Sequence, residues 1–104
     1  MQRVIDGKRY DTEKATCVAE WENEYTRSDF KFCKKALYRT PNGRWFVAGE
    51  GGAQSEFAES AGNNSWSGGS GLYPVSSDDA KELLEIWNEV SALEEYFADQ
   101  IEDA

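Results

Sequence analysis

The chain has 104 residues, of which 39% are apolar and 13% aromatic, and it carries a formal net charge of −9. This length and apolar content are typical of one small packed domain and exclude a disordered chain. Two cysteines and no histidine exclude a four-ligand structural zinc site within one chain. We therefore expect a single domain over residues 1–104, with no metal and no cofactor.

We expect no targeting segment at the start of the chain. Met1-Gln2-Arg3 is polar, whereas a signal peptide has an apolar run. The longest apolar stretch, Trp45–Ala48, is far shorter than the roughly 20 residues that span a bilayer. We expect a soluble protein of a bacterial cytoplasm that binds no membrane. In that reducing compartment Cys17 and Cys33 are expected to be free, buried thiols.

Charge is divided unevenly along the chain. Residues 1–44 hold ten basic against seven acidic side chains, a net charge of +3. Residues 45–104 hold one basic side chain, Lys81, against thirteen acidic ones, a net charge of −12. A negative field of this size repels nucleic acid and attracts basic protein surfaces.

The first third of the chain predicts short strands. Asp6-Gly7 is typical of a type I′ turn and predicts a hairpin over 4–10. Asp11 or Thr12 is suited to cap a short helix after that hairpin. The alternation over Thr16–Trp21 favours a strand, while a helix over Thr12–Trp21 is the alternative.

A second hairpin is predicted over residues 32–49. Apolar and aromatic residues flank Thr40–Gly43, in which Pro41 presets the φ angle of a turn. Gly43 suits the left-handed position of a bulged loop. This is the clearest structural signal in the sequence.

Residues 51–71 are rich in Gly, Ser and Asn and predict a long loop. Phe57 and Trp66 interrupt this composition and favour an ordered Ω-like loop over a flexible linker. Leu72–Val75 then predicts a short extended segment, which Pro74 restricts to the edge of a sheet.

Two acidic helices are predicted after Pro74. Ser76 and Asp79 form an approximate capping box for the first, and Ser91 and Glu94 form one for the second. The apolar stripes that we expect to face the core are Ala80, Leu83, Leu84 and Trp87, then Leu93, Tyr96 or Phe97, and Ile101.

These elements predict an α+β fold with a small antiparallel sheet around the hairpin 32–49, a long Gly-rich loop and two C-terminal helices. Within it, residues 1–50 form a basic-leaning β-rich part, residues 51–71 the loop, and residues 72–104 the acidic helical part.

No catalytic set is recognisable, and we expect a protein that is not an enzyme. Gly49-Glu50-Gly51-Gly52 lacks the Gly-Lys-Ser/Thr ending of a phosphate loop. Lys34 and Lys35 would lower the pKa of the Cys33 thiol, but a buried core thiol is the simpler interpretation. No histidine is present to act as a general base.

The acidic helices are the first candidate site. Carboxylates spaced along a helix can imitate the phosphates of a duplex, so that a basic nucleic-acid-binding groove accepts them. The predicted partner-binding residues are Glu82, Glu85, Glu89, Glu94, Glu95 and Asp99. Further contacts are expected from the Gly-rich loop, through Glu50, Glu56, Glu59 and Trp66.

Two other functions stay open. A strip of basic residues alternates with aromatic ones, which is typical of a surface that binds single-stranded nucleic acid. Its basic members are Lys31, Lys34, Lys35, Arg39 and Arg44. The second alternative is a regulatory or antitoxin-like partner of a co-encoded protein. Simple solubility is a further explanation of the acidic composition.

The central stretch also resembles a group of small proteins carried by phages, prophages and plasmids. The residues that carry this resemblance include Ser28-Asp29-Phe30, Leu37–Thr40, Trp45-Phe46, Gly49–Ala53, Asn64-Ser65-Trp66 and Gly68-Gly69. The resemblance implies a mobile-element accessory protein, a setting in which anti-CRISPR and other anti-defence inhibitors are found. The expected partner is then a host defence protein such as a CRISPR–Cas effector, without direct contact to nucleic acid.

Overall fold

The computed structural model describes residues 1–62 and 65–104, and Asn63 and Asn64 lie outside this part. A four-stranded antiparallel sheet in the order β3-β4-β5-β8 forms its centre. The strands are β3 (Thr16–Glu22), β4 (Cys33–Arg39), β5 (Trp45–Gly51) and β8 (Gly69–Val75). The expected α+β fold with a small antiparallel sheet is confirmed.

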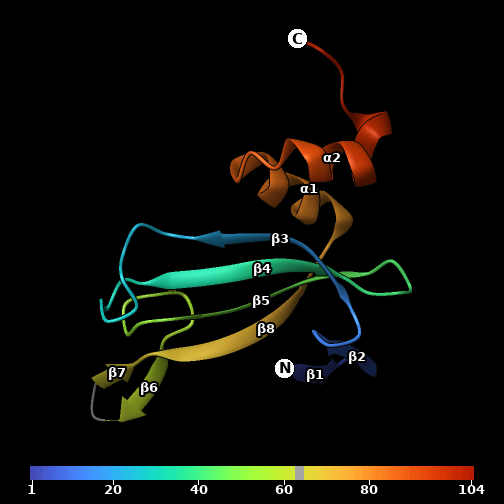
Figure 1. Cartoon of the computed structure of the whole chain (residues 1–104). Helices are drawn as coiled ribbons and strands as arrows, with labels where there is room; N and C mark the ends of the chain where they lie inside the picture. Colours follow the sequence, from blue (N-terminus) through green and yellow to red (C-terminus); the bar gives the residue numbers. More distant parts are fainter. Residues whose placement is uncertain (63–64) are drawn as a thin grey trace.

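Different elements cover the two faces of this sheet (Figure 1). Helices α1 (Ser77–Ile86) and α2 (Val90–Phe97) lie over one face, followed by a 3-10 turn, η1 (Ala98–Gln100). The hairpin of β1 (Gln2–Ile5) and β2 (Lys8–Asp11) lies against the other face. A second small hairpin, formed by β6 (Glu59–Gly62) and β7 (Ser65–Ser67), lies near the start of β8 (Figure 1).

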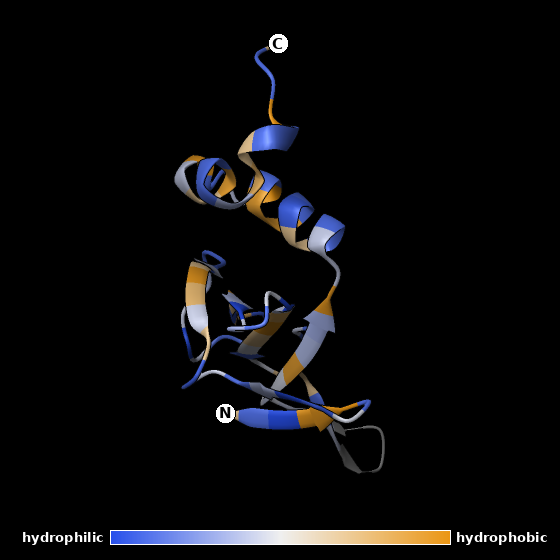
Figure 2. Cartoon of the chain, turned by 90° about the vertical axis from the view of Figure 1, so that its right-hand side faces the viewer, coloured by the Kyte–Doolittle hydropathy of each residue, from blue (hydrophilic) through white to orange (hydrophobic). Residues whose placement is uncertain are grey.

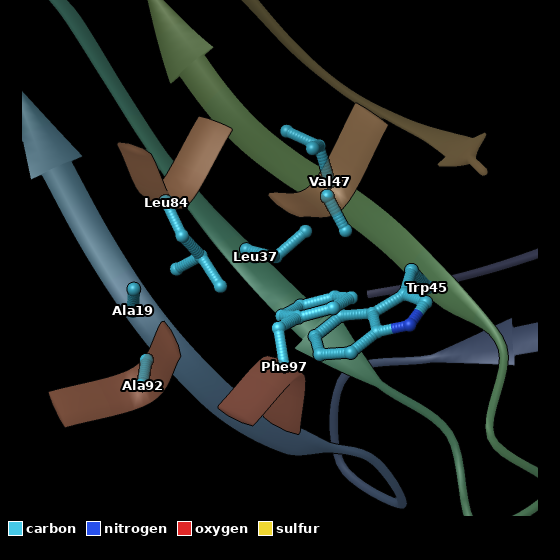
Figure 3. Packing of buried hydrophobic residues seen from close by; sticks show 8 residues of the cluster. Ala19, Leu37, Trp45, Val47, Leu84, Ala92 and Phe97 are labelled. Atoms are coloured by element: carbon cyan, nitrogen blue, oxygen red, sulfur yellow. The ribbon is translucent and has the colours of Figure 1, made fainter. Parts of the chain in front are cut away.

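The helices are held on the sheet by one hydrophobic cluster. Leu37 of β4 and Val47 of β5 are fully buried beneath Leu84 of α1. Trp45 stacks on Phe97 of α2 with ring centroids 5.5 Å apart. Figure 3 shows these side chains converging from the sheet and both helices.

A second cluster lies on the opposite face, because side chains alternate between the faces along each strand. Phe46 is fully buried there, and its ring meets Tyr10 of β2 edge-on at 5.6 Å. Tyr38 stacks on the same Phe46 ring at 5.1 Å. The N-terminal hairpin is also attached through Arg3, whose Nη1 donates to the Leu72 carbonyl at 3.0 Å.

The predicted turn at Asp6-Gly7 and the predicted strand over Thr16–Trp21 are confirmed, whereas the short helix expected between them does not form. Asp6 and Gly7 have φ angles of 52° and 76°, as a type I′ turn requires. The predicted strand over Thr16–Trp21 forms β3, so the helical alternative is wrong. The short helix expected after Asp11 is also wrong, because Asp11 closes a single turn through Lys14 N and Ala15 N before β3 begins.

The hairpin predicted over 32–49 is confirmed. Thr40 N donates to Arg44 O at 2.8 Å across the turn, and Gly43 has a φ angle of 83°. Seven residues of β4 pair with β5, from Cys33 opposite Gly51 to Arg39 opposite Trp45.

The long loop expected over 51–71 is largely replaced by strands. β5 continues to Gly51 and pairs with β8 from Gly69 onward, while β6 and β7 occupy much of the interval. The glycines permit close packing here. A Cβ atom on Gly49 would lie 2.7 Å from the Phe57 ring, and one on Gly51 would lie 2.2 Å from Ser55 Oγ.

The first helix follows its prediction and the second departs from it. Ser76 Oγ accepts from Asp79 N at 3.0 Å, which confirms the N-cap of α1. The second capping box does not form, because Asn88 turns the chain at a φ angle of 55° and α2 begins at Val90. Ser91 therefore lies inside the first turn of α2.

The inward face of α2 agrees with the expected stripe at Leu93, Tyr96 and Phe97, which all belong to the hydrophobic cluster under the helices, and differs from it at Ala92 and Ile101. Ala92 and Phe97 are buried, whereas Ile101 lies beyond the end of α2 and is 43% exposed. Neither α1 nor α2 is long and apolar enough to cross a bilayer, and the same holds for every described helix. Cys17 and Cys33 are both free, but the expectation that both are buried is wrong, because Cys17 is exposed.

Candidate functional site

The fold separates the charge of the chain more sharply than the sequence halves do. Residues 77–104, which form the helices and the C-terminal tail, hold ten acidic side chains against Lys81, a net charge of −9. Residues 1–76 hold ten acidic and ten basic side chains and are neutral. The whole net charge therefore lies in the segment 77–104, which we call the helical layer. Figure 2 shows hydrophilic ribbon recurring along both helices and the tail.

The predicted acidic residues all lie in this layer. Glu82 and Glu85 lie on α1, Glu94 and Glu95 on α2, and each is exposed. Asp99 is exposed in η1, while Glu89 is half-buried at the N-cap of α2.

One cation within ion-pairing distance of these carboxylates is found in the described part of the chain. Lys81 Nζ lies 3.8 Å from Glu85 Oε1, one turn away on α1. The other predicted carboxylates have no Lys or Arg partner among residues 1–62 and 65–104. The helical layer therefore presents largely uncompensated negative charge to solvent.

A shallow groove with an apolar floor runs through the helical layer. Its volume is about 360 Å³, and Val90, Leu93 and Ile101 contribute the apolar side chains. Glu85, Glu94 and Glu102 also line the groove, together with Lys81. Val90 is 54% exposed, so an apolar contact is available next to the carboxylates.

The predicted basic strip is dispersed by the fold. Lys35 and Arg39 share the face of β4 that carries Leu37, whereas Lys34 projects from the opposite face with Tyr38. Lys31 and Arg44 lie outside β4, in the preceding loop and in the hairpin turn. The structure does not bring these five basic residues onto one surface.

Two of the cations on the helix-covered face already have partners. Lys35 Nζ lies 2.7 Å from Glu56 Oε1. The Arg39 guanidinium lies over the rings of Trp45 and Tyr96, with its carbon 5.6 Å and 5.5 Å from their centroids. The Lys35 charge is therefore compensated by a carboxylate, whereas the Arg39 guanidinium is held against aromatic rings.

Glu56, one of the predicted loop contacts, lies in a polar cluster with Lys35, Tyr73 and Cys33. The Tyr73 hydroxyl donates to Glu56 Oε2 at 3.2 Å, and burial together with the Glu56 charge raises the pKa of Tyr73 to about 12. Burial, followed by the charge of Glu56, also raises the pKa of the Cys33 thiol. The opposing effect of Lys35 is smaller, so this thiol is protonated at neutral pH and is a poor nucleophile.

The other three predicted loop contacts meet at a second groove, at the end of the sheet farthest from the β4–β5 turn. Glu50, Glu59 and Trp66 all line this groove, which has a volume of about 740 Å³. Residues 27–30, which were not among the predicted loop contacts, also line this groove. Phe30 was the available signal, because it is a large apolar residue inside a polar segment.

No protein-family model matches the chain, and neither a curated protein nor a solved structure shows similarity to it. Within residues 1–62 and 65–104, no group of three Cys, Asp or Glu side chains converges as metal ligands.

Proposed function

We propose that the protein is a non-enzymatic inhibitor, encoded by a phage or another mobile element, that binds a basic nucleic-acid-binding surface of a host defence complex such as a CRISPR–Cas effector. One observation carries the proposal. The helical layer holds the entire net charge of −9, while the remainder of the chain is neutral.

The geometry of the layer suits imitation of a nucleic acid. Duplex DNA presents one negative charge per roughly 1.7 Å of its axis, and a basic groove gains affinity by exchanging counterions for those charges. Successive turns of a helix rise about 5.4 Å, so Glu82 and Glu85 lie about one turn apart on the same side of α1, while Glu94 and Glu95 are consecutive residues of α2. Leu84 and Phe97 anchor both helices on the sheet, which holds the carboxylates in a fixed arrangement.

A regulatory or antitoxin-like role is the second candidate. The groove that combines exposed Val90 with the carboxylates of Glu85 and Glu94 favours it, because a nucleic-acid mimic needs charge but no apolar anchor. In that case the partner is a basic protein that inserts an apolar side chain between acidic ones.

A nuclease-inhibition assay tests the main proposal. CRISPR–Cas effectors are assayed for target-DNA cleavage with the wild-type protein and with a helical triple variant, Glu82→Lys, Glu94→Lys and Glu95→Lys. These side chains are exposed, so the fold should persist. We expect the concentration needed for half inhibition to rise at least about tenfold, because like charges then face each other across the interface.

A matched control makes the same charge change in residues 1–76, which we call the sheet region. The sheet triple variant carries Glu13→Lys, Glu22→Lys and Glu24→Lys, at positions that are also exposed. It should inhibit as the wild type does. Full inhibition by the helical triple variant would refute the proposed mechanism. Inhibition only of a co-encoded protein, with no effect on any effector, would favour the antitoxin-like role.

A further inference from the structure

The groove at the far end of the sheet is assembled from three segments that are distant in sequence. Gly51 of β5 pairs with Gly69 of β8, and Glu50 pairs with Ser70. Residues 27–30 approach from the loop between β3 and β4, where Gln54 N donates to Phe30 O at 2.7 Å. The groove is therefore a product of long-range pairing.

Glycine forms the floor of this groove because the backbones approach closely. A Cβ atom on Gly52 would lie 2.5 Å from Phe30 O, and one on Gly68 would lie 2.7 Å from Gly51 O. Side chains at these positions would push the walls apart. These glycines line the groove, which we call the channel, and its volume of about 740 Å³ is within the usual range for a ligand site.

Two aromatic side chains line the channel without being buried. Phe30 is 66% exposed and Trp66 is 61% exposed, whereas nearby Phe32 is only 5% exposed. Phe32 supports the wall, with the Arg27 guanidinium carbon 5.5 Å from its ring centroid. Phe30 and Trp66 therefore offer ring surface that a ligand can cover.

The charges around the channel favour a cation. Arg27 is its only basic lining residue among those described, against Asp29, Glu50 and Glu59. Arg27 Nη2 pairs with Glu50 Oε1, so its charge is already compensated. Asp29 and Glu59 have no Lys or Arg within ion-pairing distance in the described part of the chain.

We propose that this channel binds an extended peptide segment and takes one of its Lys or Arg side chains against Phe30 and Trp66, with the positive charge facing Asp29 and Glu59. Aromatic faces attract cations through the ring quadrupole, and the carboxylates add Coulomb attraction. The net negative lining opposes a phosphate or nucleic-acid ligand. No residue of the helical layer lines the channel, so this site is independent of the proposed inhibitory surface.

The test uses a probe that carries a single positive charge, because a polycation would also bind the helical layer. The blocked peptide acetyl-Ala-Arg-Ala-amide is titrated into ¹⁵N-labelled protein, with acetyl-Ala-Gln-Ala-amide as the neutral control. We expect saturable shifts of the Trp66 indole N–H and the Gly51 and Gly68 amides with the arginine peptide alone. Trp66→Ala and Asp29→Asn should each raise the dissociation constant at least about threefold.

Two protein controls separate this proposal from the inhibitory one. Tyr25→Ala removes an exposed ring that does not line the channel and should bind the arginine peptide normally. The helical triple variant should also bind it normally. Equal shifts with the glutamine peptide, shifts confined to residues 77–104, or no shifts at all would each overturn the channel proposal. None of these results would affect the nuclease-inhibition test.

Discussion

The sheet region and the helical layer handle charge in opposite ways. Residues 1–76 balance ten acidic with ten basic side chains, and pairs such as Lys35–Glu56 cross between segments. Residues 77–104 carry ten acidic side chains and one lysine. The first region is therefore neutral and some of its charges are paired, whereas the second carries a net negative charge that repels itself.

The two regions also differ in what holds them in place. The sheet contributes large side chains to clusters on both of its faces, including Leu37, Phe46 and Val47. The helices contribute Ala80, Leu84, Ala92 and Phe97 to a single cluster. Leu83, Trp87, Leu93 and Tyr96 of the helices also pack, partly buried, against this cluster, so the position of the acidic surface depends on one hydrophobic cluster rather than two.

The largest effect is expected from Leu84→Ala. Leu84 is fully buried between α1 and the sheet, and its truncation should lower the free energy of unfolding by about 2–5 kcal/mol. Urea denaturation measures the loss, and Ile86→Ala, at a 69% exposed position, is the control. Hydrogen exchange should show the amides of α1 and α2 losing protection before those of β4 and β5. A loss below about 1 kcal/mol would show that Leu84 does not anchor the layer.

A smaller loss is expected from Glu56→Gln. The Lys35 side chain is only 16% exposed, and without the Glu56 charge its ammonium group loses the compensation for that burial. We expect a decrease of about 1–2 kcal/mol in the free energy of unfolding. Glu59→Gln, which breaks no ion pair in the described residues, should change it by less than about 0.5 kcal/mol. Equal effects of the two substitutions would contradict the distinction between a structural and a ligand-facing carboxylate.

Stability should also fall at alkaline pH because of Tyr73. Its pKa is raised from 10.0 to about 12 in the folded protein, so the unfolded chain releases this proton first as the pH rises. The contribution is fully present below pH 10 and is lost as the pH rises toward 12. We expect a loss on the order of 1 kcal/mol. Denaturant unfolding at pH 10 and at about pH 12 measures this loss. The free energy of unfolding should decrease less in Tyr73→Phe than in the wild type, and an equal decrease in both would exclude Tyr73 as the cause.

The smallest effect concerns self-repulsion in the helical layer. Replacing Glu82, Glu94 and Glu95 by Gln should raise the free energy of unfolding by up to about 0.5 kcal/mol at low salt, and added salt should remove the gain. The matched replacement of Glu13, Glu22 and Glu24 should give no such gain, since the sheet region is neutral. Thermal denaturation at two salt concentrations measures both. A rise in the free energy of unfolding on replacing Glu13, Glu22 and Glu24 by Gln, without one for the helical replacements, would contradict the self-repulsion of the helical layer.

Much of the fold could be predicted where the signal is local. Asp6-Gly7 and Thr40–Gly43 specify their turns within a few residues, and Ser76 specifies the start of α1 through its own side chain. Strand β8 could not be predicted in full, because its pairing with β5, such as Gly69 with Gly51, is long-range. Strands β6 and β7 pair locally, but the Gly, Ser and Asn content of their segment is typical of a loop. In the structure, however, the missing side chain of Gly49 leaves room for the Phe57 ring, which packs against β5 at that point.

The candidate sites also differ in whether a local sequence pattern predicts them. The acidic residues of the helices were predictable, since helical periodicity places charged residues opposite the buried Ala80 and Leu84. Phe30 could not be assigned to the same groove as Trp66, because no local pattern relates the two segments. The spacing of the basic strip does not predict a shared face, because adjacent residues of a strand, such as Lys34 and Lys35, project to opposite faces.

The salt dependence of partner binding tests the central claim most directly. The dissociation constant of the complex with an inhibited effector is measured over a salt series for the wild type, the helical triple variant and the sheet triple variant. If the helical layer makes the contact, the wild type and the sheet variant share a steep dependence, while the helical variant binds weakly with a shallow one. An unchanged dependence in the helical variant, or an equal loss in the sheet variant, would contradict the account.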